Sequence, residues 1–326
     1  MKYLQREESF ICIGFEPVKL RYPVYGNNIK IYRYSSNGIN DYVIGKDFEI
    51  SDGKIIRTIG SSFPDYRNSD FYNVSSFDHE GLTKYGNTDF MMFADYTSVI
   101  EEEQTSDYQA KLISKGNGNF GALSSIFGKF SKKNFELLIF GDSISAGGGA
   151  TSDAKAYYSL FADEIRKRYD IEVNITNKAI GGESSIDGIR RYIDVIKPSY
   201  DLMILAYGMN DQVVNSDGKQ YFFPQDYKSN LRVFIEYANE MNVPVVLISP
   251  CLSNPRWVHT SKIFMQFVEQ VRELSKEYGI PYADVTSLWQ NELKYKTYSD
   301  LLDNDINHPT NYGHYLYFIS LVALLG

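Results

Sequence analysis

Apolar and polar residues alternate along the first third of the chain, as they do in β-strands with one buried face. Ile29 and Ile31, for example, alternate with the polar residues Asn28 and Lys30. Further along, residues 48–51 and 54–58 flank the dipeptide Asp52-Gly53, which suits a tight hairpin turn. Because no helical pattern of convincing length interrupts residues 10–108, we predict an all-β sandwich of jelly-roll type here.

The pattern changes after a stretch rich in Gly, Ser and Lys at residues 114–134. Continuous apolar runs typical of buried strands follow at residues 135–140, 202–206 and 243–248. Helical spacing of apolar residues follows at residues 154–169, 227–241 and 263–278. Strands that alternate with helices predict an α/β domain with a parallel sheet. We therefore divide the chain into residues 1–131, a β-sandwich, and residues 132–326, the α/β domain.

Composition excludes some classes of partner. The chain has 326 residues, 43% of them hydrophobic, and a formal net charge of −8 without a long basic run, so we expect neither nucleic-acid binding nor attachment to an anionic membrane. No apolar run approaches the roughly 20 residues that span a bilayer, and no signal peptide is visible. Cys12 and Cys251 lie far apart and predict no disulfide. These features favour a cytoplasmic protein, and they leave the oligomeric state open.

The first candidate for chemistry is Ser143. It follows the apolar run 135–140 directly, in the segment Gly141-Asp142-Ser143, so it should lie at the carboxyl end of a parallel strand, where ligands bind in open α/β sheets. A serine is a weak nucleophile until a base accepts its proton. The sequence therefore has to supply a histidine from elsewhere.

His308 is the best of the four histidines. Asp305 lies three residues before it, and Pro309 follows, which suits a turn in which the carboxylate orients the imidazole. Asp303 is a rival carboxylate, five residues before His308, but its spacing is less favourable. His314, at the start of the last helix, is expected to be structural. His79 and His259 are expected to be surface or loop residues.

Ester hydrolysis through a tetrahedral intermediate also needs donors for an oxyanion. Gly182 can offer a backbone N–H without an obstructing Cβ, and Asn210 can offer an uncharged side-chain amide; the N–H of Ser143 would be the third donor. Both Gly182 and Asn210 follow apolar stretches that should end at the same sheet edge as Ser143. Each could instead belong to an ordinary turn or helix cap, and it is their joint position that favours the functional interpretation.

These segments resemble the four conserved blocks of the SGNH (GDSL-type) hydrolases, with Ser143, Gly182, Asn210 and His308 at the family's positions and Asp305 as its acid. The resemblance covers about residues 135–326, and Ile144 replaces the leucine of the family's shorthand. It implies a flavodoxin-like three-layer α/β/α domain that hydrolyses carboxylic esters through Ser143, His308 and Asp305, without a metal or other cofactor.

The sequence says less about the substrate than about the reaction. A β-sandwich before such a domain is similar in layout to carbohydrate esterase family 2. This resemblance implies removal of O-acetyl groups from a saccharide or glycan, and it makes residues 1–131 a candidate carbohydrate-binding domain. Trp257, in a loop expected at the same sheet edge, is a candidate for stacking on the substrate. The alternatives are an O-acyltransferase with the same triad, a lipase or thioesterase, and a carbohydrate-binding protein with a vestigial hydrolase domain.

Overall fold

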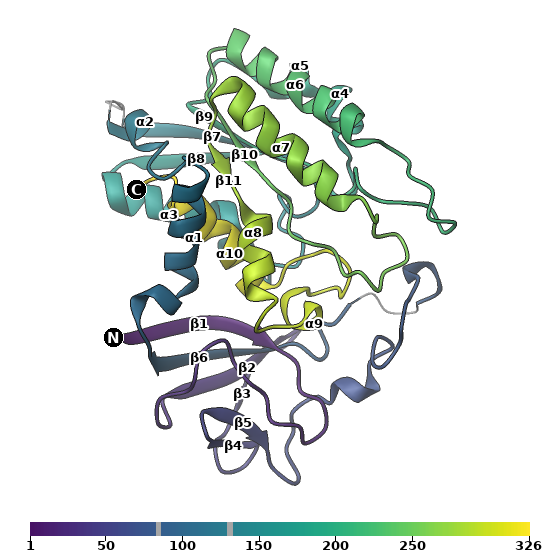
Figure 1. Cartoon of the computed structure of the whole chain (residues 1–326). Coiled ribbons are helices and arrows are strands. Elements are labelled where there is room, and N and C mark those ends of the chain that lie inside the picture. Colours follow the sequence, from purple (N-terminus) through teal and green to yellow (C-terminus); the bar gives the residue numbers. More distant parts are fainter. Residues whose placement is uncertain (83–85, 129–132) are drawn as a thin grey trace.

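A computed structural model describes residues 1–82, 86–128 and 133–326 (Figure 1). The described residues include an antiparallel β region near the N-terminus and an α/β region that follows it along the chain. The predicted domain boundary between residues 131 and 132 lies outside the described residues, so it stays a prediction. Within the described ranges, no helix is both long and apolar enough to cross a membrane.

The α/β region is built on a five-stranded parallel sheet with the strand order β11-β10-β9-β7-β8. Its strands are β7 (Asn134–Gly141), β8 (Glu172–Asn177), β9 (Leu202–Ala206), β10 (Val245–Ile248) and β11 (Tyr282–Ala283). Every residue of β9 and β10 is buried, because helices cover both faces of the sheet. The three predicted strands are confirmed to within two residues at each end.

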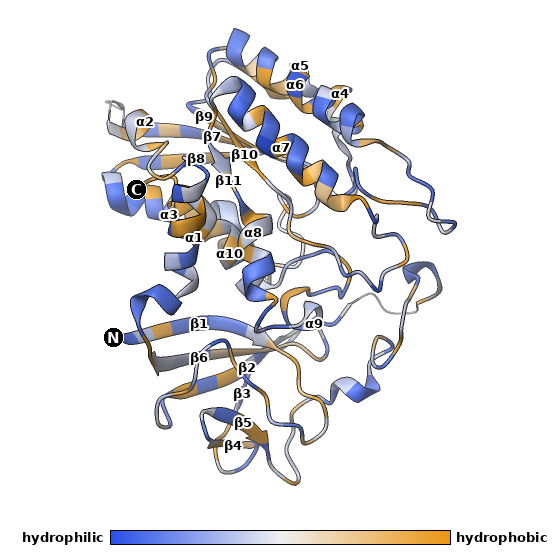
Figure 2. Cartoon of the chain, viewed as in Figure 1, coloured by the Kyte–Doolittle hydropathy of each residue, from blue (hydrophilic) through white to orange (hydrophobic). Residues whose placement is uncertain are grey.

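Side chains that alternate along β7 enter two different cores. Leu137 and Ile139 pack with the helices of one face, whereas Leu138 and Phe140 pack with those of the other. The first face carries α1 (Ser106–Gly116), α2 (Ser124–Gly128), α3 (Tyr157–Tyr169), α8 (Val285–Glu292) and α10 (Asn311–Val322). The second face carries α4 (Ser185–Ile189), α5 (Tyr192–Val195), α6 (Pro224–Glu240) and α7 (Phe264–Tyr278). Figure 2 shows apolar strands between these layers and polar residues on the outer sides of α6 and α7. The predicted three-layer α/β fold is confirmed.

The N-terminal region contains a four-stranded antiparallel sheet with the strand order β1-β6-β2-β3 and a separate hairpin, β4-β5. The strands are β1 (Lys2–Phe10), β2 (Ile29–Ser35), β3 (Gly38–Tyr42), β4 (Phe48–Ser51), β5 (Lys54–Arg57) and β6 (Met92–Val99). Asp52 and Gly53 both have positive φ at the hairpin turn, as the dipeptide predicted. The antiparallel β region is confirmed, and its jelly-roll detail stays a prediction.

Two helices that the sequence pattern did not predict connect these regions. Helix α1 packs against α8 and α10, and Leu123 and Phe127 enter the same core of the α/β region. Residues 106–128 therefore pack with the α/β region, although they precede its first strand.

Candidate active site

Strand β7 delivers Ser143 to the carboxyl edge of the parallel sheet. Directly after the strand, the Oδ1 atom of Asp142 accepts a hydrogen bond from the N–H of Ile144 at 3.0 Å and so stabilises a tight turn around the serine. Asp142 is buried, which raises its pKa to about 7, whereas Ser143 itself is only partly buried. Asp142 and Ile144 are thus fixed in the core, whereas the Ser143 side chain between them stays partly accessible at the edge of the sheet.

The imidazole of His308 lies against this serine. Its Nε2 atom is 2.9 Å from Ser143 Oγ, which is within the range for proton transfer from a nucleophile to a general base. Burial lowers the pKa of His308 below its usual value. The ring therefore stays neutral, and able to accept a proton, to a lower pH than an exposed histidine would.

Gly148 lets the loop after Ser143 pass close to this pair. A Cβ atom at residue 148 would lie 2.8 Å from the backbone oxygen of Ser143 and 3.3 Å from the His308 ring. The carbonyl of Gly148 lies 3.1 Å from Nε2 of His314, which is fully buried in α10. His314 thus holds the loop beside the active pair, and its burial supports the structural role predicted for it.

The predicted contact between Asp305 and His308 is not formed. The Asp305 carboxylate accepts hydrogen bonds from Tyr66 Oη at 2.6 Å and Ser299 Oγ at 2.8 Å, and the Arg256 guanidinium lies 3.4 Å away. Among the interactions of the described residues, no hydrogen bond or ion pair joins Asp305 to His308. Asp305 has a φ of 57°, so the turn directs its side chain into the interface with the N-terminal region.

Asn304 builds the turn that carries His308. Its Oδ1 atom accepts hydrogen bonds from the backbone N–H groups of Ile306, Asn307 and His308, at 2.8 to 3.0 Å. The rival carboxylate, Asp303, lies near the hydroxyl of Thr88. Neither nearby aspartate therefore orients the imidazole, and a serine–histidine pair remains.

The two other predicted oxyanion donors lie on neighbouring loops. Gly182 has a φ of 81° and is exposed, and within the described ranges the N–H groups of Gly182 and Ser143 have no acceptor. The side-chain amide of Asn210 donates one hydrogen bond to the carbonyl of Glu183 at 2.8 Å, which leaves its second N–H for another acceptor. These groups are able to stabilise a developing negative charge.

Asp211 connects the two oxyanion loops. Its carboxylate accepts hydrogen bonds from the N–H and the hydroxyl of Ser185, the first residue of α4. Asp211 is fully buried, which raises its pKa to about 6. Together with the Asn210–Glu183 bond, this contact fixes the loop of Gly182 relative to that of Asn210.

Trp257 does not present a surface for substrate. It is only 6% exposed and packs in a cluster with Phe71, Phe77 and Ile306, and its indole N–H donates to His79 Nδ1 at 3.0 Å. The structure therefore does not support the predicted stacking role of Trp257. It also places His259, expected in a surface or loop position, at 6% exposure near His79 and Asp78. Two features of the sequence could have indicated this cluster. Asp78 and His79 are adjacent, and His259 lies two residues after Trp257.

A three-layer α/β fold with a serine and a histidine at the carboxyl edge of its sheet is typical of serine ester hydrolases. The model of the GDSL-like lipase/acylhydrolase family matches residues 139–316, more than half of the chain, so this protein belongs to that family. It is therefore a carboxylic ester hydrolase, and the family and enzyme class predicted from its sequence are confirmed.

Two solved structures show the extent of the similarity. A GDSL-like lipase from Parabacteroides merdae is 21% identical, with a TM-score of 0.51, over 60% of this chain and 99% of its own. The acetylxylan esterase Axe2 from Geobacillus stearothermophilus is 21% identical, with a TM-score of 0.50, over 60% of this chain and 97% of its own. At this identity the similarity shows the fold. A comparison with curated protein sequences gives no match to the chain.

Proposed function

We propose that this hydrolase removes O-acetyl groups from a saccharide or glycan by way of an acyl-enzyme on Ser143. The observation that carries the serine mechanism is the 2.9 Å separation between His308 Nε2 and Ser143 Oγ at the sheet edge. The acetyl preference is supported by the shared fold of the acetylxylan esterase. It is also supported by the β region that precedes the hydrolase region, the layout of sugar deacetylases.

In the first half of the proposed reaction, Ser143 Oγ bonds to the ester carbonyl carbon while its proton passes to His308 Nε2. The N–H groups of Ser143 and Gly182 and the amide of Asn210 donate to the oxyanion. When the carbon–oxygen bond to the sugar breaks, His308 returns the proton to the leaving sugar oxygen. Ser143 then carries the acetyl group.

The second half repeats these transfers with water. A water molecule attacks the acyl-enzyme while His308 Nε2 accepts one of its protons, and the bond between Ser143 Oγ and the acyl carbon breaks. The proton then returns to Oγ, and acetic acid leaves and gives its remaining proton to the solvent, forming acetate. The lowered pKa of His308 suits this role because the neutral ring is the form that accepts protons.

The test is hydrolysis of acetyl, butyryl and octanoyl nitrophenyl esters, with an acetylated xylo-oligosaccharide as the saccharide substrate. We expect a preference for acetyl, release of acetate from the saccharide, and a loss of several orders of magnitude in kcat for Ser143→Ala and for His308→Ala, because such residues act as a unit. Circular dichroism checks that both variants fold. An octanoyl preference would contradict the deacetylase proposal, and near wild-type rates in Ser143→Ala would contradict the acyl-enzyme.

A further inference from the structure

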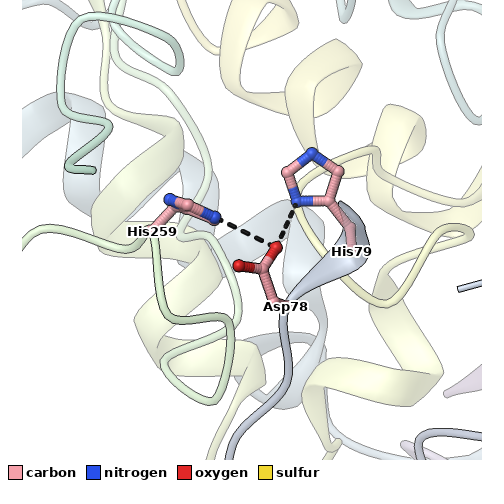
Figure 3. A group of neighbouring side chains, drawn as sticks. All are labelled: Asp78, His79 and His259. Atoms are coloured by element: carbon pink, nitrogen blue, oxygen red, sulfur yellow. Dashed lines mark hydrogen bonds and ion pairs between the residues drawn. The ribbon is translucent and has the colours of Figure 1, made fainter. Parts of the chain in front are cut away.

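Asp78, His79 and His259 form a polar cluster between the N-terminal region and the hydrolase region, and we call it the Asp78–His79–His259 cluster (Figure 3). One ligand atom from each residue lies within 4.8 Å of the other two. Asp78 caps a short 3₁₀ helix, η2 (His79–Gly81), and its Oδ1 atom accepts from the N–H of Glu80. His259 comes from the loop that follows β10.

Backbone hydrogen bonds hold these two segments side by side. The N–H of Phe77 donates to the carbonyl of Arg256 at 2.9 Å, and the N–H of Val258 donates to the carbonyl of Phe77 at 3.1 Å. Residues adjacent to these bonds therefore have little freedom to move apart. The approach of Asp78 to His259 is a consequence of this pairing.

The hydrogen bonds of His259 fix which ring nitrogen carries a proton. Its Nδ1 atom lies 2.7 Å from the carbonyl oxygen of Val214, which can only accept, so Nδ1 carries the hydrogen. The Nε2 atom of the neutral ring then has a lone pair, and it faces Asp78 Oδ1 at 3.1 Å. A histidine that donates its other N–H to a carbonyl in this way is the common arrangement of metal ligands in proteins.

The Nδ1 atom of His79 is also an acceptor. The indole nitrogen of Trp257 can only donate, and it lies 3.0 Å from this atom, so Nδ1 of His79 carries no hydrogen and its lone pair accepts the indole N–H beside the cluster. The same Nδ1 atom is 3.5 Å from Asp78 Oδ1. Two ring nitrogens that can accept and a carboxylate thus lie within 4.8 Å of one another, an arrangement that a cation would stabilise.

We propose that the Asp78–His79–His259 cluster binds a divalent transition-metal cation of the zinc class, with His259 Nε2, His79 Nδ1 and an Asp78 oxygen as ligands. A tetrahedral zinc ion with bonds of about 2.0–2.1 Å separates its ligand atoms by roughly 3.3 Å. The separations of 3.1 and 3.5 Å from Asp78 Oδ1 lie on either side of that value. Imidazole nitrogen with carboxylate oxygen is a ligand set that zinc accepts.

The cation would act as a clamp between the two regions of the chain. Asp78 and His79 belong to the N-terminal region, whereas His259 is bonded through Val214 to the loop that begins at Asn210. The side chains of Asp78 and His79 are 36% and 29% exposed, so water can reach the remaining coordination positions. This proposal is independent of the proposed ester hydrolysis.

Zinc binding requires His79 Nδ1 to release the indole N–H of Trp257, which supplies a spectroscopic signal. The experiment treats the full chain with a chelator, removes the chelator, and titrates zinc chloride by calorimetry and by tryptophan fluorescence. We expect one zinc ion per chain, a change in Trp257 emission, and a rise in Tm on zinc addition. Trp289, the other tryptophan, is fully buried in α8 and should not respond.

Variants assign the binding to the cluster. His259→Ala and Asp78→Asn should each weaken zinc binding by at least roughly tenfold, since even the loss of an outer-shell partner costs about 10–100-fold. Trp257→Phe should lose the emission change and bind zinc more tightly, because no indole N–H competes for His79. His308→Ala is the control for binding at the active-site imidazole and should match the wild type.

Circular dichroism establishes that each variant folds. If His259→Ala does not fold, Asp78→Asn remains as the test, because it retains the cap of η2. Two results would overturn the proposal. One is the absence of zinc binding to the wild type. The other is an unchanged affinity in both ligand variants.

Discussion

The His308 ring meets Ser143 through Nε2 at 2.9 Å, and no carboxylate of the described residues bonds to the opposite side of the ring. In a complete triad that carboxylate fixes the ring and stabilises the imidazolium, and its loss costs about ten-thousandfold in kcat. Here Asp305 is buried and satisfied by Tyr66 and Ser299. Its contribution should therefore be to the stability of the interface.

The variant Asp305→Asn distinguishes a catalytic role of Asp305 from a role in the stability of the interface. Because the side chain does not contact His308, we expect kcat for nitrophenyl acetate to stay within roughly tenfold of the wild type, against about ten-thousandfold for a triad aspartate. The Arg256 guanidinium loses its charged neighbour at 3.4 Å, so the free energy of unfolding should fall by about 1–3 kcal/mol. Enzyme kinetics and urea unfolding measure the two effects.

His308→Ala provides the comparison, since it should lose activity without the same loss of stability. A loss of more than a thousandfold in kcat for Asp305→Asn, with its stability unchanged, would restore Asp305 to the catalytic triad.

The order of motifs was enough to predict that Ser143 and His308 meet. The position of Ser143 follows from where a strand of the parallel sheet ends, and His308 was identified by the turn motif that includes Pro309. The direction of the Asp305 side chain was not predictable in the same way. A spacing of three residues does not reveal that Asp305 adopts a φ of 57° or that Asn304 supplies the acceptor for the turn. The burial of Trp257 was not predictable for a related reason, since the N-terminal region that covers it is distant in sequence. A stacking role was therefore predicted for a side chain that the structure buries.

At the scale of elements, apolar periodicity predicted the strands and helices that bury strong hydrophobic faces. Helices α3, α6 and α7 were expected within three residues of their observed starts. Helix α1 was missed because its buried positions are the small residues Ser106, Ala110 and Ser114, which leave no apolar stripe in the sequence. Its position depends on packing against α8 and α10, which is tertiary information.

Helix α10 fixes the loop beside the active pair through His314. Burial lowers the pKa of His314 to about 4, while Nε2 lies near the carbonyl of Gly148 and Nδ1 lies 3.4 Å from the N–H of Tyr157. The folded protein keeps this ring neutral below pH 6.5, where the unfolded chain already binds a proton. The stability from His314 is therefore complete above pH 6.5 and declines as the pH falls towards about 4.

The variant His314→Gln keeps a donor near Gly148 and removes the titration. Between pH 7 and pH 5 the wild type should lose roughly 2 kcal/mol more of its free energy of unfolding than the variant does. Urea unfolding at the two pH values measures the difference. Asp142 and Asp211, whose pKa values burial raises to about 7 and about 6, have the opposite sign and act in both proteins. Equal pH dependence of the free energy of unfolding in the two proteins would contradict its assignment to His314.

At the scale of the whole molecule, buried ion pairs join the N-terminal region to the hydrolase region. Lys296 Nζ lies 2.7 Å from the Glu8 carboxylate, with side-chain exposures of 1% and 0%. Arg21 similarly contacts Glu292 at 3.0 Å. The two regions were predictable from the change in periodicity, but these contacts were not, because nothing in the sequence pairs residue 8 with residue 296.

The Glu8–Lys296 pair provides a test of how strongly the two regions depend on each other. Burial alone would lower the pKa of Lys296, but the carboxylates of Glu8, Asp300 and Glu292, with Glu8 first among them, more than offset this, so the pKa is raised and the amine stays charged. Lys296→Met removes the positive charge and leaves a carboxylate enclosed in the interface. Breaking one side of a buried pair in this way costs about 3–5 kcal/mol.

We expect Lys296→Met to lower the free energy of unfolding by that amount. The double variant Glu8→Gln with Lys296→Met should recover much of the loss, because no unpaired charge remains. The amide oxygen introduced at position 8 can still accept one of the hydrogen bonds that Tyr96 and the N–H of Arg21 now donate to the Glu8 carboxylate. Trp257 contacts the N-terminal region, so urea unfolding should be followed with Trp257→Phe present in every protein compared. The fluorescence of Trp289 in α8 then reports on the hydrolase region, and far-ultraviolet circular dichroism reports on both regions. If the interface couples the regions, the two signals change together in the parent protein, and with Lys296→Met added the N-terminal region unfolds first. A double variant as unstable as the single one would show that the contribution of this pair is not electrostatic.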